Sequence, residues 1–186
     1  MNFNKHLNLE GQHAFLSASK YHWLNYDEEK LADVYSKYLA TLKGTELHAL
    51  ACHCIRMGVK LARTKETLNM YVNDAISFKM TPEQPLYFSP NCFGTADAIS
   101  FRNNFLRIHD LKTGVSPTSM HQLEIYAALF CLEYDVQPND MKGMELRIYQ
   151  SDEIIVNEPN PEDILYAMNK IVLFDKQIEK MKMEVL

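Results

Sequence analysis

The chain has 186 residues, of which 47% are hydrophobic and 23% are charged. This length and composition suit one globular domain with a full-sized core and exclude a disordered chain. The net charge of -5, from 19 basic and 24 acidic residues, argues against a protein that coats nucleic acid non-specifically, because such binding depends on phosphate neutralisation. An enzyme that meets nucleic acid in one basic cleft is still compatible with this charge.

No apolar run approaches the roughly 20 residues that a membrane-spanning helix needs. Residues 1–12 also lack the apolar stretch of a signal peptide. We therefore expect a cytoplasmic protein without a membrane partner. Its four cysteines are then expected to be reduced thiols rather than a disulfide framework.

Helical patterns dominate the first third of the chain. The pattern predicts a helix over residues 17–42, with Ser17 or Ser19 as its N-cap, and Gly44 is expected to interrupt it. A second helix is predicted over residues 45–67.

The second helix is predicted to carry a basic face. This face is either an ordinary solvated surface or a surface that follows the phosphates of a nucleic acid. Its members are His53, Arg56, Lys60 and Arg63.

Strand patterns follow a loop that Pro82 and Pro85 are expected to form. The predicted elements after it are strands at 86–88, 94–101 and 105–111, a helix at 118–134, strands at 144–150 and 153–156, and a helix at 161–186. This order of elements predicts an α/β or α+β fold with a central mixed sheet flanked by helices.

The last predicted helix carries apolar residues at alternating spacings of three and four. Such a stripe faces the core of the same chain or forms a homo-oligomer through this helix, although the repeat is shorter than a coiled coil requires. Its members are Ile164, Ala167, Ile171, Phe174, Ile178, Met181 and Val185.

A hairpin is predicted around Asn103 and Asn104, because asparagine tolerates positive φ and suits a two-residue loop. This turn places Arg102 opposite Phe105. Counting outward, the pairs that share one face are Phe101–Leu106, Ile99–Ile108, Asp97–Asp110 and Thr95–Lys112.

The far end of this hairpin therefore gathers charge. Asp97 and Asp110 repel each other unless a cation lies between them or one of them is protonated. Lys112 is one candidate cation, and a divalent metal is a better one because carboxylate oxygens suit Mg²⁺ or Mn²⁺. Alternatively, the two carboxylates end their strands in water and Lys112 pairs with either.

Four short motifs resemble the RecB-like branch of the PD-(D/E)XK nucleases. They occur in the order of that family and on the expected element types. They are Gly44-Thr-Glu-Leu-His48, Gly94-Thr-Ala-Asp97, Asp110-Leu-Lys112 and Gln122-Leu-Glu-Ile-Tyr126. The segments at 13–25 and 144–150 are also similar to small phage-encoded nucleases of this branch, so the resemblance covers nearly the whole chain.

The resemblance implies one restriction-endonuclease-like domain over residues 1–186, acting as a metal-dependent DNA nuclease. It implies an exonuclease in phage DNA recombination or processing, which uses metal-activated water to hydrolyse phosphodiester bonds. A phage-encoded protein would act in the host cytoplasm.

The resemblance also assigns roles to residues. Mg²⁺ or Mn²⁺ would be held by His48, Asp97, Asp110 and the backbone carbonyl of Leu111. Lys112 would position or activate the attacking water, while Gln122 and Tyr126 would support the site or touch the nucleic acid. Further candidate contacts to DNA are Ser17, Ser19, Arg56, Lys60 and Arg63.

The chain departs from this family at Cys52, where many relatives carry a glutamate. Glu46 or Glu83 are the local carboxylates that could compensate. No iron–sulfur cluster is expected, because no cysteine follows Cys131 and Tyr26 stands where phage relatives often have cysteine.

Two alternatives accompany this interpretation. A zinc site from His48, Cys52, His53 and Cys54 is disfavoured because adjacent residues on a helix do not converge on one ion. A non-catalytic nuclease-like protein that binds DNA or another protein is favoured slightly by the acidic net charge and by Cys52.

Overall fold

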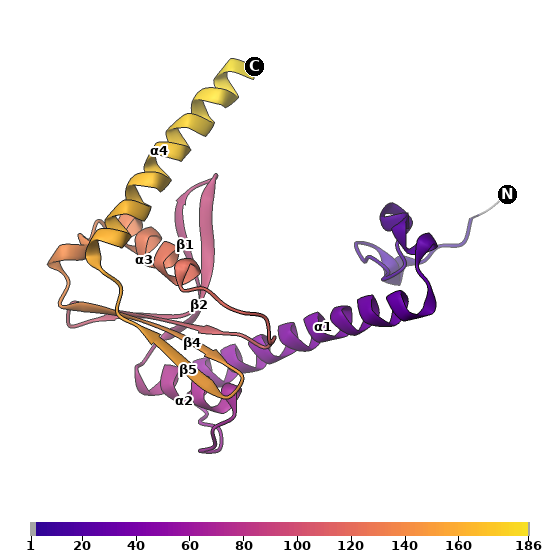
Figure 1. Ribbon diagram of the computed structural model, residues 1–186, viewed down its shortest axis with the longest axis horizontal. Coiled ribbons are helices and arrows are strands. Elements are labelled where there is room, and N and C mark those ends of the chain that lie inside the picture. The colour runs from indigo at the N-terminus through magenta and orange to yellow at the C-terminus, as the bar shows by residue number, and fades with distance from the viewer. Residues whose placement is uncertain (1–2, 186) are drawn as a thin grey trace. The chain divides into compact units, whose positions relative to one another are not determined.

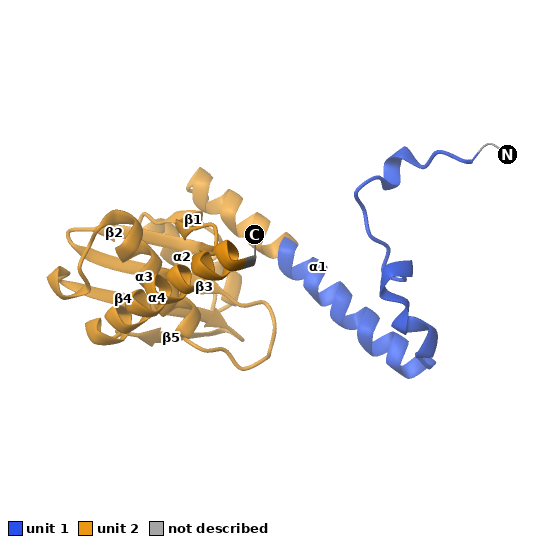
Figure 2. Ribbon diagram, turned by 90° about the horizontal axis from the view of Figure 1, so that it is seen from above, with its two compact units in different colours: residues 1–45 blue, residues 46–186 orange. Residues whose placement is uncertain are grey.

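The computed structural model describes residues 3–185, apart from the side chain of Val185. The chain divides into two compact units, residues 1–45 and residues 46–186 (Figure 2). From His48 onward, every residue of the four nuclease-like motifs lies in the second unit.

The first unit contains two short 3-10 helices, η1 (Leu7–Leu9) and η2 (Ala18–Asn25), and the start of helix α1 (Glu28–Met57). Asp27 is the N-cap of α1, and its Oδ1 accepts a hydrogen bond from the amide of Lys30 at 2.8 Å. The helix predicted over 17–42 is confirmed from residue 28 onward, but its predicted start at Ser17 or Ser19 is wrong. The Ser17 hydroxyl pairs with the Ser19 hydroxyl at 2.8 Å and caps no helix.

Gly44 does not interrupt α1, contrary to the prediction. One interior glycine costs a helix only about 1 kcal/mol relative to alanine, and the turns on both sides remain helical. The helix instead ends after Met57, where Gly58 has a left-handed φ of 66°. The amide of Val59 donates to the carbonyl of Cys54 at 2.9 Å across this ending.

The helix predicted over 45–67 is confirmed for residues 45–57, and its continuation to residue 67 is wrong. A separate helix, α2 (Thr67–Ser77), follows. This helix is not among the elements predicted from the sequence. Its start is held from outside the helix, because the amide of Thr67 donates to Asp152 Oδ1 at 2.9 Å. The capping residue lies 85 residues further along the chain. Local sequence patterns therefore do not reveal where α2 begins.

A five-stranded mixed sheet forms the centre of the second unit (Figure 1). Its strands lie in chain order, and only β3 and β4 run parallel. The strands are β1 (Thr81–Ser89), β2 (Cys92–Arg102), β3 (Phe105–Leu111), β4 (Gly143–Gln150) and β5 (Glu153–Asn157). The predicted α/β fold with a central mixed sheet is confirmed.

The β2–β3 hairpin has the predicted turn and register. Asn103 and Asn104 both have positive φ, at 53° and 62°, as a two-residue hairpin turn requires. Arg102 pairs with Phe105, and the ladder continues through Ile99–Ile108 to its last pair at Ala98–His109. Asp97 and Asp110 come directly after that last pair.

The loop predicted at Pro82 and Pro85 is wrong, because both prolines belong to β1. They pair with Ala98 and Thr95 of β2. A proline is tolerated at the edge of a sheet, where its missing N–H can face away from the neighbouring strand, and β1 is an edge strand.

Helices cover the two faces of the sheet. Helices α3 (His121–Tyr134) and α4 (Pro161–Val185) pack on one face, and α2 packs on the other with the residues of α1 that belong to the second unit. The short 3-10 helix η3 (Pro138–Asp140) precedes β4. Within residues 3–185, none of the helices has the length and apolar character needed to cross a membrane.

Candidate metal centre

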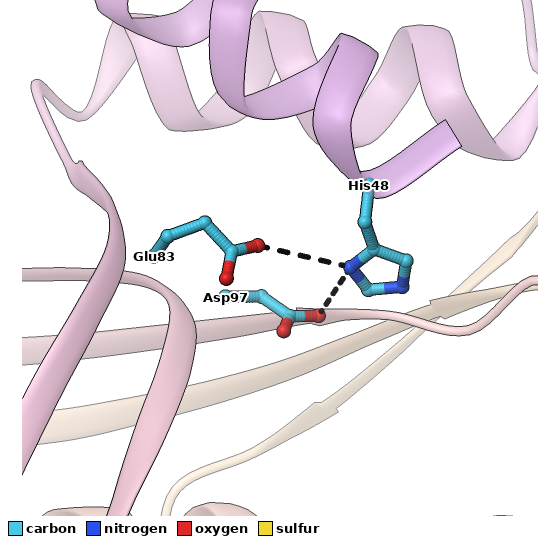
Figure 3. A group of neighbouring side chains, drawn as sticks. All are labelled: His48, Glu83 and Asp97. Atoms are coloured by element: carbon cyan, nitrogen blue, oxygen red, sulfur yellow. Dashed lines mark ion pairs between the residues drawn. The ribbon is translucent and has the colours of Figure 1, made fainter. Parts of the chain in front are cut away.

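Three side chains from three different elements converge at one end of the sheet (Figure 3). His48 comes from α1, Glu83 from β1 and Asp97 from β2. Each offers one ligand atom, and these atoms lie within 4.8 Å of one another. His48 Nδ1 is 3.5 Å from Asp97 Oδ2 and 3.9 Å from Glu83 Oε1. One imidazole nitrogen and two carboxylate oxygens form a donor set that suits Mn²⁺ or Mg²⁺.

Glu83 has an unusual backbone conformation inside β1. Its φ is 49°, a left-handed value that residues other than glycine adopt at a cost of about 1–3 kcal/mol. The neighbouring pairs Pro82–Ala98 and Gln84–Ala96 leave Glu83 and Asp97 facing each other across β1 and β2. Strain at this residue accompanies the placement of its carboxylate beside Asp97.

Asp97 is held by the backbone of β3. Its Oδ2 accepts a hydrogen bond from the amide of Leu111 at 2.8 Å. Burial, followed by the nearby charge of Asp110, raises the pKa of Asp97 to about 6, even though the Leu111 hydrogen bond and His48 lower it. The carboxylate therefore lacks sufficient positive charge around it.

Asp110 is almost fully buried, with 2% of its surface exposed. Lys112 Nζ donates to its Oδ1 at 3.1 Å and lies 3.0 Å from its Oδ2. Oδ2 nevertheless has no hydrogen-bond partner among the described residues. Burial raises the pKa of Asp110, while Lys112 is the main influence that lowers it. This oxygen, which has the ion pair with Lys112 but accepts no hydrogen bond, can accept a further cation.

A chain of side chains continues from Lys112 onto α3. Lys112 Nζ donates to Gln122 Oε1 at 2.9 Å, and Gln122 Nε2 donates to the hydroxyl of Tyr126 at 3.0 Å. The Tyr126 ring lies against Gly94 of β2, where an added Cβ would be 2.9 Å from the ring atom Cε1. The absence of a side chain at Gly94 thus permits the position of Tyr126.

The structure gives two of the predicted residues somewhat different surroundings. The amide of Leu111 binds Asp97, while the predicted role of its carbonyl as a metal ligand stays a prediction. Cys52 is half-buried, and burial raises the pKa of its thiol. Glu83 supplies a carboxylate to the cluster, whereas Glu46, the other alternative, is exposed on α1.

The predicted basic helix face does not form. Arg56 lies in the last turn of α1, but Lys60 and Arg63 lie beyond the end of this helix. Lys60 Nζ donates to the Ser77 hydroxyl at 3.3 Å. Because Gly58 ends the helix, these side chains do not follow one helical surface, and a contact of any of them with DNA stays a prediction.

Ser17 and Ser19 belong to the first unit. Besides the hydrogen bond between their hydroxyls, the carbonyl of Ser17 accepts a hydrogen bond from Trp23 Nε1 at 2.9 Å. These contacts stabilise the local turn, and a contact of either serine with DNA stays a prediction.

No protein-family model matches the chain, and no curated protein matches its sequence. The resemblance to the RecB-like nucleases therefore rests on the motif residues of this chain and stays a prediction.

Proposed function

We propose that the protein is a Mg²⁺- or Mn²⁺-dependent deoxyribonuclease that hydrolyses phosphodiester bonds. The observation that carries this proposal is the convergence of His48, Glu83 and Asp97 beside the buried Asp110 and its partly exposed partner Lys112. The resemblance of the motifs adds the role: an exonuclease in phage DNA recombination or processing, acting in the host cytoplasm.

The charges in this cluster support a divalent cation. Three carboxylates, from Glu83, Asp97 and Asp110, face the single ammonium of Lys112, which leaves two negative charges when His48 is neutral. His48 Nδ1 and the oxygens of Glu83 and Asp97 would hold the cation, with Asp110 Oδ2 as a further oxygen. A divalent ion there would lower the pKa of a water molecule and offset negative charge on the scissile phosphate.

Lys112 supplies the positive charge of the protein itself. Its side chain is 30% exposed, so that a substrate can reach it, while Asp110 and Gln122 fix the position of its ammonium. A fixed ammonium can orient a water molecule or a phosphate oxygen and stabilise charge that develops during hydrolysis. Gln122 and Tyr126 act through this ammonium and also present polar atoms to a nucleic acid.

A cleavage assay tests the proposal. Linear single- and double-stranded DNA should be degraded with Mg²⁺ or Mn²⁺, and Asp110→Ala or Lys112→Ala should lower the rate at least about 100-fold, since such groups contribute about 10²–10⁴. The matched controls are Asp140→Ala and Lys142→Ala, which remove an exposed aspartate and an exposed lysine away from the cluster. Equal rates for the wild type and the two cluster variants would refute the proposal.

The second candidate is a non-catalytic protein that binds DNA or another protein through the same fold. Cys52 favours it, because the expected helix carboxylate is missing. A metal titration separates the two functions. A binder without a metal site gains no thermal stability from Mn²⁺, whereas an ion that binds only the native state must raise it.

A further inference from the structure

A basic pocket lies at the turn end of the β2–β3 hairpin. It has a volume of about 530 Å³ and is lined by residues from the end of α2, from the hairpin and from the loop before β4. None of its lining residues is acidic, and four are cations: Lys79, Arg102, Arg107 and Lys142. The metal centre lies toward the other end of these strands, since Asp97 precedes Arg102 by five residues, or about 17 Å along β2.

Most of the positive charge of this pocket has no partner. Among residues 3–185, Lys79, Arg102 and Lys142 form no ion pair and donate no side-chain hydrogen bond. Arg107 does have a partner, Glu145, whose Oε1 is 3.3 Å away, but Glu145 also pairs with Arg147 at 3.1 Å. The pocket therefore gathers positive charge that an anion would offset, although the whole chain has a net charge of -5.

The guanidinium of Arg107 is held in a fixed position. Its Cζ lies 4.6 Å from the centre of the Phe78 ring and 4.3 Å from that of the Phe105 ring. The Phe105 ring in turn lies against Gly143, where an added Cβ would be 2.8 Å from the ring atom Cε2.

The hydrogen bonds of Arg107 leave part of its guanidinium unused. Nε donates to Glu145 Oε1 at 3.3 Å, whereas Nη1 and Nη2 donate to no atom of the described residues. The side chain is 25% exposed and lines the pocket, so a ligand can reach it. A fixed guanidinium with two unused amino groups suits the recognition of two oxygens of one phosphate.

We propose that this pocket binds the phosphate group of a small phosphorylated molecule of about nucleotide size. Arg107 binds two phosphate oxygens, and the charges of Lys79 and Arg102 add to the attraction. The volume of about 530 Å³ is typical of pockets for small molecules. Several cations around one ligand match a phosphate monoester, which carries nearly two negative charges at neutral pH, better than a single carboxylate.

A nucleic-acid strand is the less favoured ligand. A strand needs cations spaced along a path that follows its phosphates, whereas these cations line one pocket. The proposal does not rest on the nuclease function, because it uses none of the residues assigned to the metal centre. The ligand of this pocket and the DNA cleaved at the metal centre are therefore separate.

Calorimetric titration of the full chain tests the site, with EDTA present so that no divalent metal contributes. Inorganic phosphate and adenosine 5′-monophosphate should both bind. The monophosphate should bind at least about 10-fold more tightly than adenosine, which lacks the phosphate. Binding of both phosphates should weaken as the NaCl concentration rises, because salt screens the cations.

Substitutions in the pocket locate the binding. Arg107→Lys should weaken binding of the monophosphate at least about 10-fold, since lysine cannot donate two parallel hydrogen bonds. This variant keeps a positive charge beside Glu145. Lys79→Asn and Arg102→Ala should each weaken binding several-fold, and asparagine tolerates the φ of 52° at position 79. Because Lys79 and Arg102 are exposed, these two variants provide the test even if Arg107→Lys does not fold.

Two controls exclude other sites. Lys180→Asn removes a lysine of α4 whose side chain is 76% exposed, and it should not change the binding of the monophosphate. Lys112→Ala removes the ammonium of the metal centre and should also leave this binding unchanged. A loss in Lys112→Ala without a loss in the pocket variants would move the phosphate to the metal centre and overturn the proposal.

Three further results would overturn the proposal. The first is that neither inorganic phosphate nor the monophosphate binds. The second is that adenosine binds as tightly as the monophosphate, or that the pocket variants bind the monophosphate like the wild type. The third is that a short oligonucleotide without a terminal phosphate binds in the pocket while the two small phosphates do not, which would assign the pocket to nucleic acid.

Discussion

Two clusters of polar side chains in the second unit differ in how far their carboxylates are compensated by positive charges. One is the candidate metal centre. The other, which we call the arginine network, contains Asp74, Arg107, His109, Glu145, Arg147 and Tyr149. In the arginine network, Arg147 contacts Asp74 Oδ2 at 3.0 Å and Glu145 Oε1 at 3.1 Å, and Arg107 contacts Glu145 at 3.3 Å. Two carboxylates thus meet two guanidinium groups, whereas in the candidate metal centre the ammonium of Lys112 pairs with Asp110, and Glu83 and Asp97 have only His48 beside them as a possible cation.

The titration of the buried groups reflects this difference. Burial lowers the pKa of His109 to about 3, with help from Arg147 and Arg107, so that this imidazole adds no charge to a balanced network. Burial and the neighbouring carboxylates of Asp110 and Glu83 raise the pKa of Asp97 to about 6. A balanced cluster stabilises the fold by itself, while the unbalanced one needs protons or a bound cation.

The largest expected effect is that of a substitution at Asp97, which should lower activity and raise stability. Asp97→Asn should lower DNA cleavage at least about 100-fold and remove the stabilisation by Mn²⁺. Without metal, it should raise the free energy of unfolding at pH 7.5 by about 1–2 kcal/mol, because it removes a buried carboxylate whose pKa is raised. Cleavage assays and urea unfolding measure the two effects. If Asp97→Asn were less stable than the wild type without metal, the view that the Asp97 carboxylate is insufficiently compensated would be contradicted.

The arginine network should respond in the opposite way. Arg147→Met leaves the carboxylates of Asp74 and Glu145 without their main partner and should lower the free energy of unfolding by about 3 kcal/mol. The thermal shift caused by Mn²⁺ should not change. Arg63→Met, which removes an exposed arginine, is the control and should change stability by less than about 0.5 kcal/mol. Urea unfolding checks both, and a similar effect of the two variants would refute this view of the network.

Metal binding should depend on pH through Asp97. At pH 7.5 and 100 times its dissociation constant, Mn²⁺ should raise the free energy of unfolding by about 2.7 kcal/mol. The same Mn²⁺ concentration should give a smaller gain at pH 5.5, because protons compete for the carboxylate whose pKa is about 6. Without metal, the contribution of Asp97 to stability falls as the pH rises from about 4 to 6, since the folded state binds the extra proton. Equal Mn²⁺ gains at both pH values would contradict the assignment.

The smallest effect concerns the strained strand residue. Glu83→Asn introduces a residue type that tolerates positive φ and removes the carboxylate. Without metal it should leave the free energy of unfolding unchanged or raise it by up to about 1 kcal/mol, while the affinity for Mn²⁺ falls at least about 10-fold. Isothermal titration measures the affinity. An unchanged affinity would remove Glu83 from the ligand set.

The hairpin and its charges were predictable from the sequence because they depend on local rules. Asn103 and Asn104 define the turn, and alternation along the strands then brings Asp97 and Asp110 to the same end. The position of Glu83 could not be predicted with the same certainty, because its carboxylate reaches Asp97 only through a left-handed backbone conformation. No local pattern announces that conformation in a glutamate.

Other errors arose where distant parts of the chain decide local structure. Pro82 and Pro85 suggest a loop unless the strand order makes β1 an edge strand. Helix α2 depends on its distant cap from Asp152. The end of α1 differs, because Gly58 just past the helix is a local C-terminal signal that the sequence does contain. Propensity patterns do not contain such tertiary constraints.

The missing side chain at Gly94 affects which substitutions the protein can tolerate. Gly94 carries no functional group, yet a methyl group at this position would push the Tyr126 ring, and through Gln122 would displace the ammonium of Lys112. Inactivating changes at Gly94 would therefore resemble changes in a reacting residue. They should differ in one respect: a second substitution that trims the ring of Tyr126 can suppress them, whereas no such suppressor can replace the charge of Lys112.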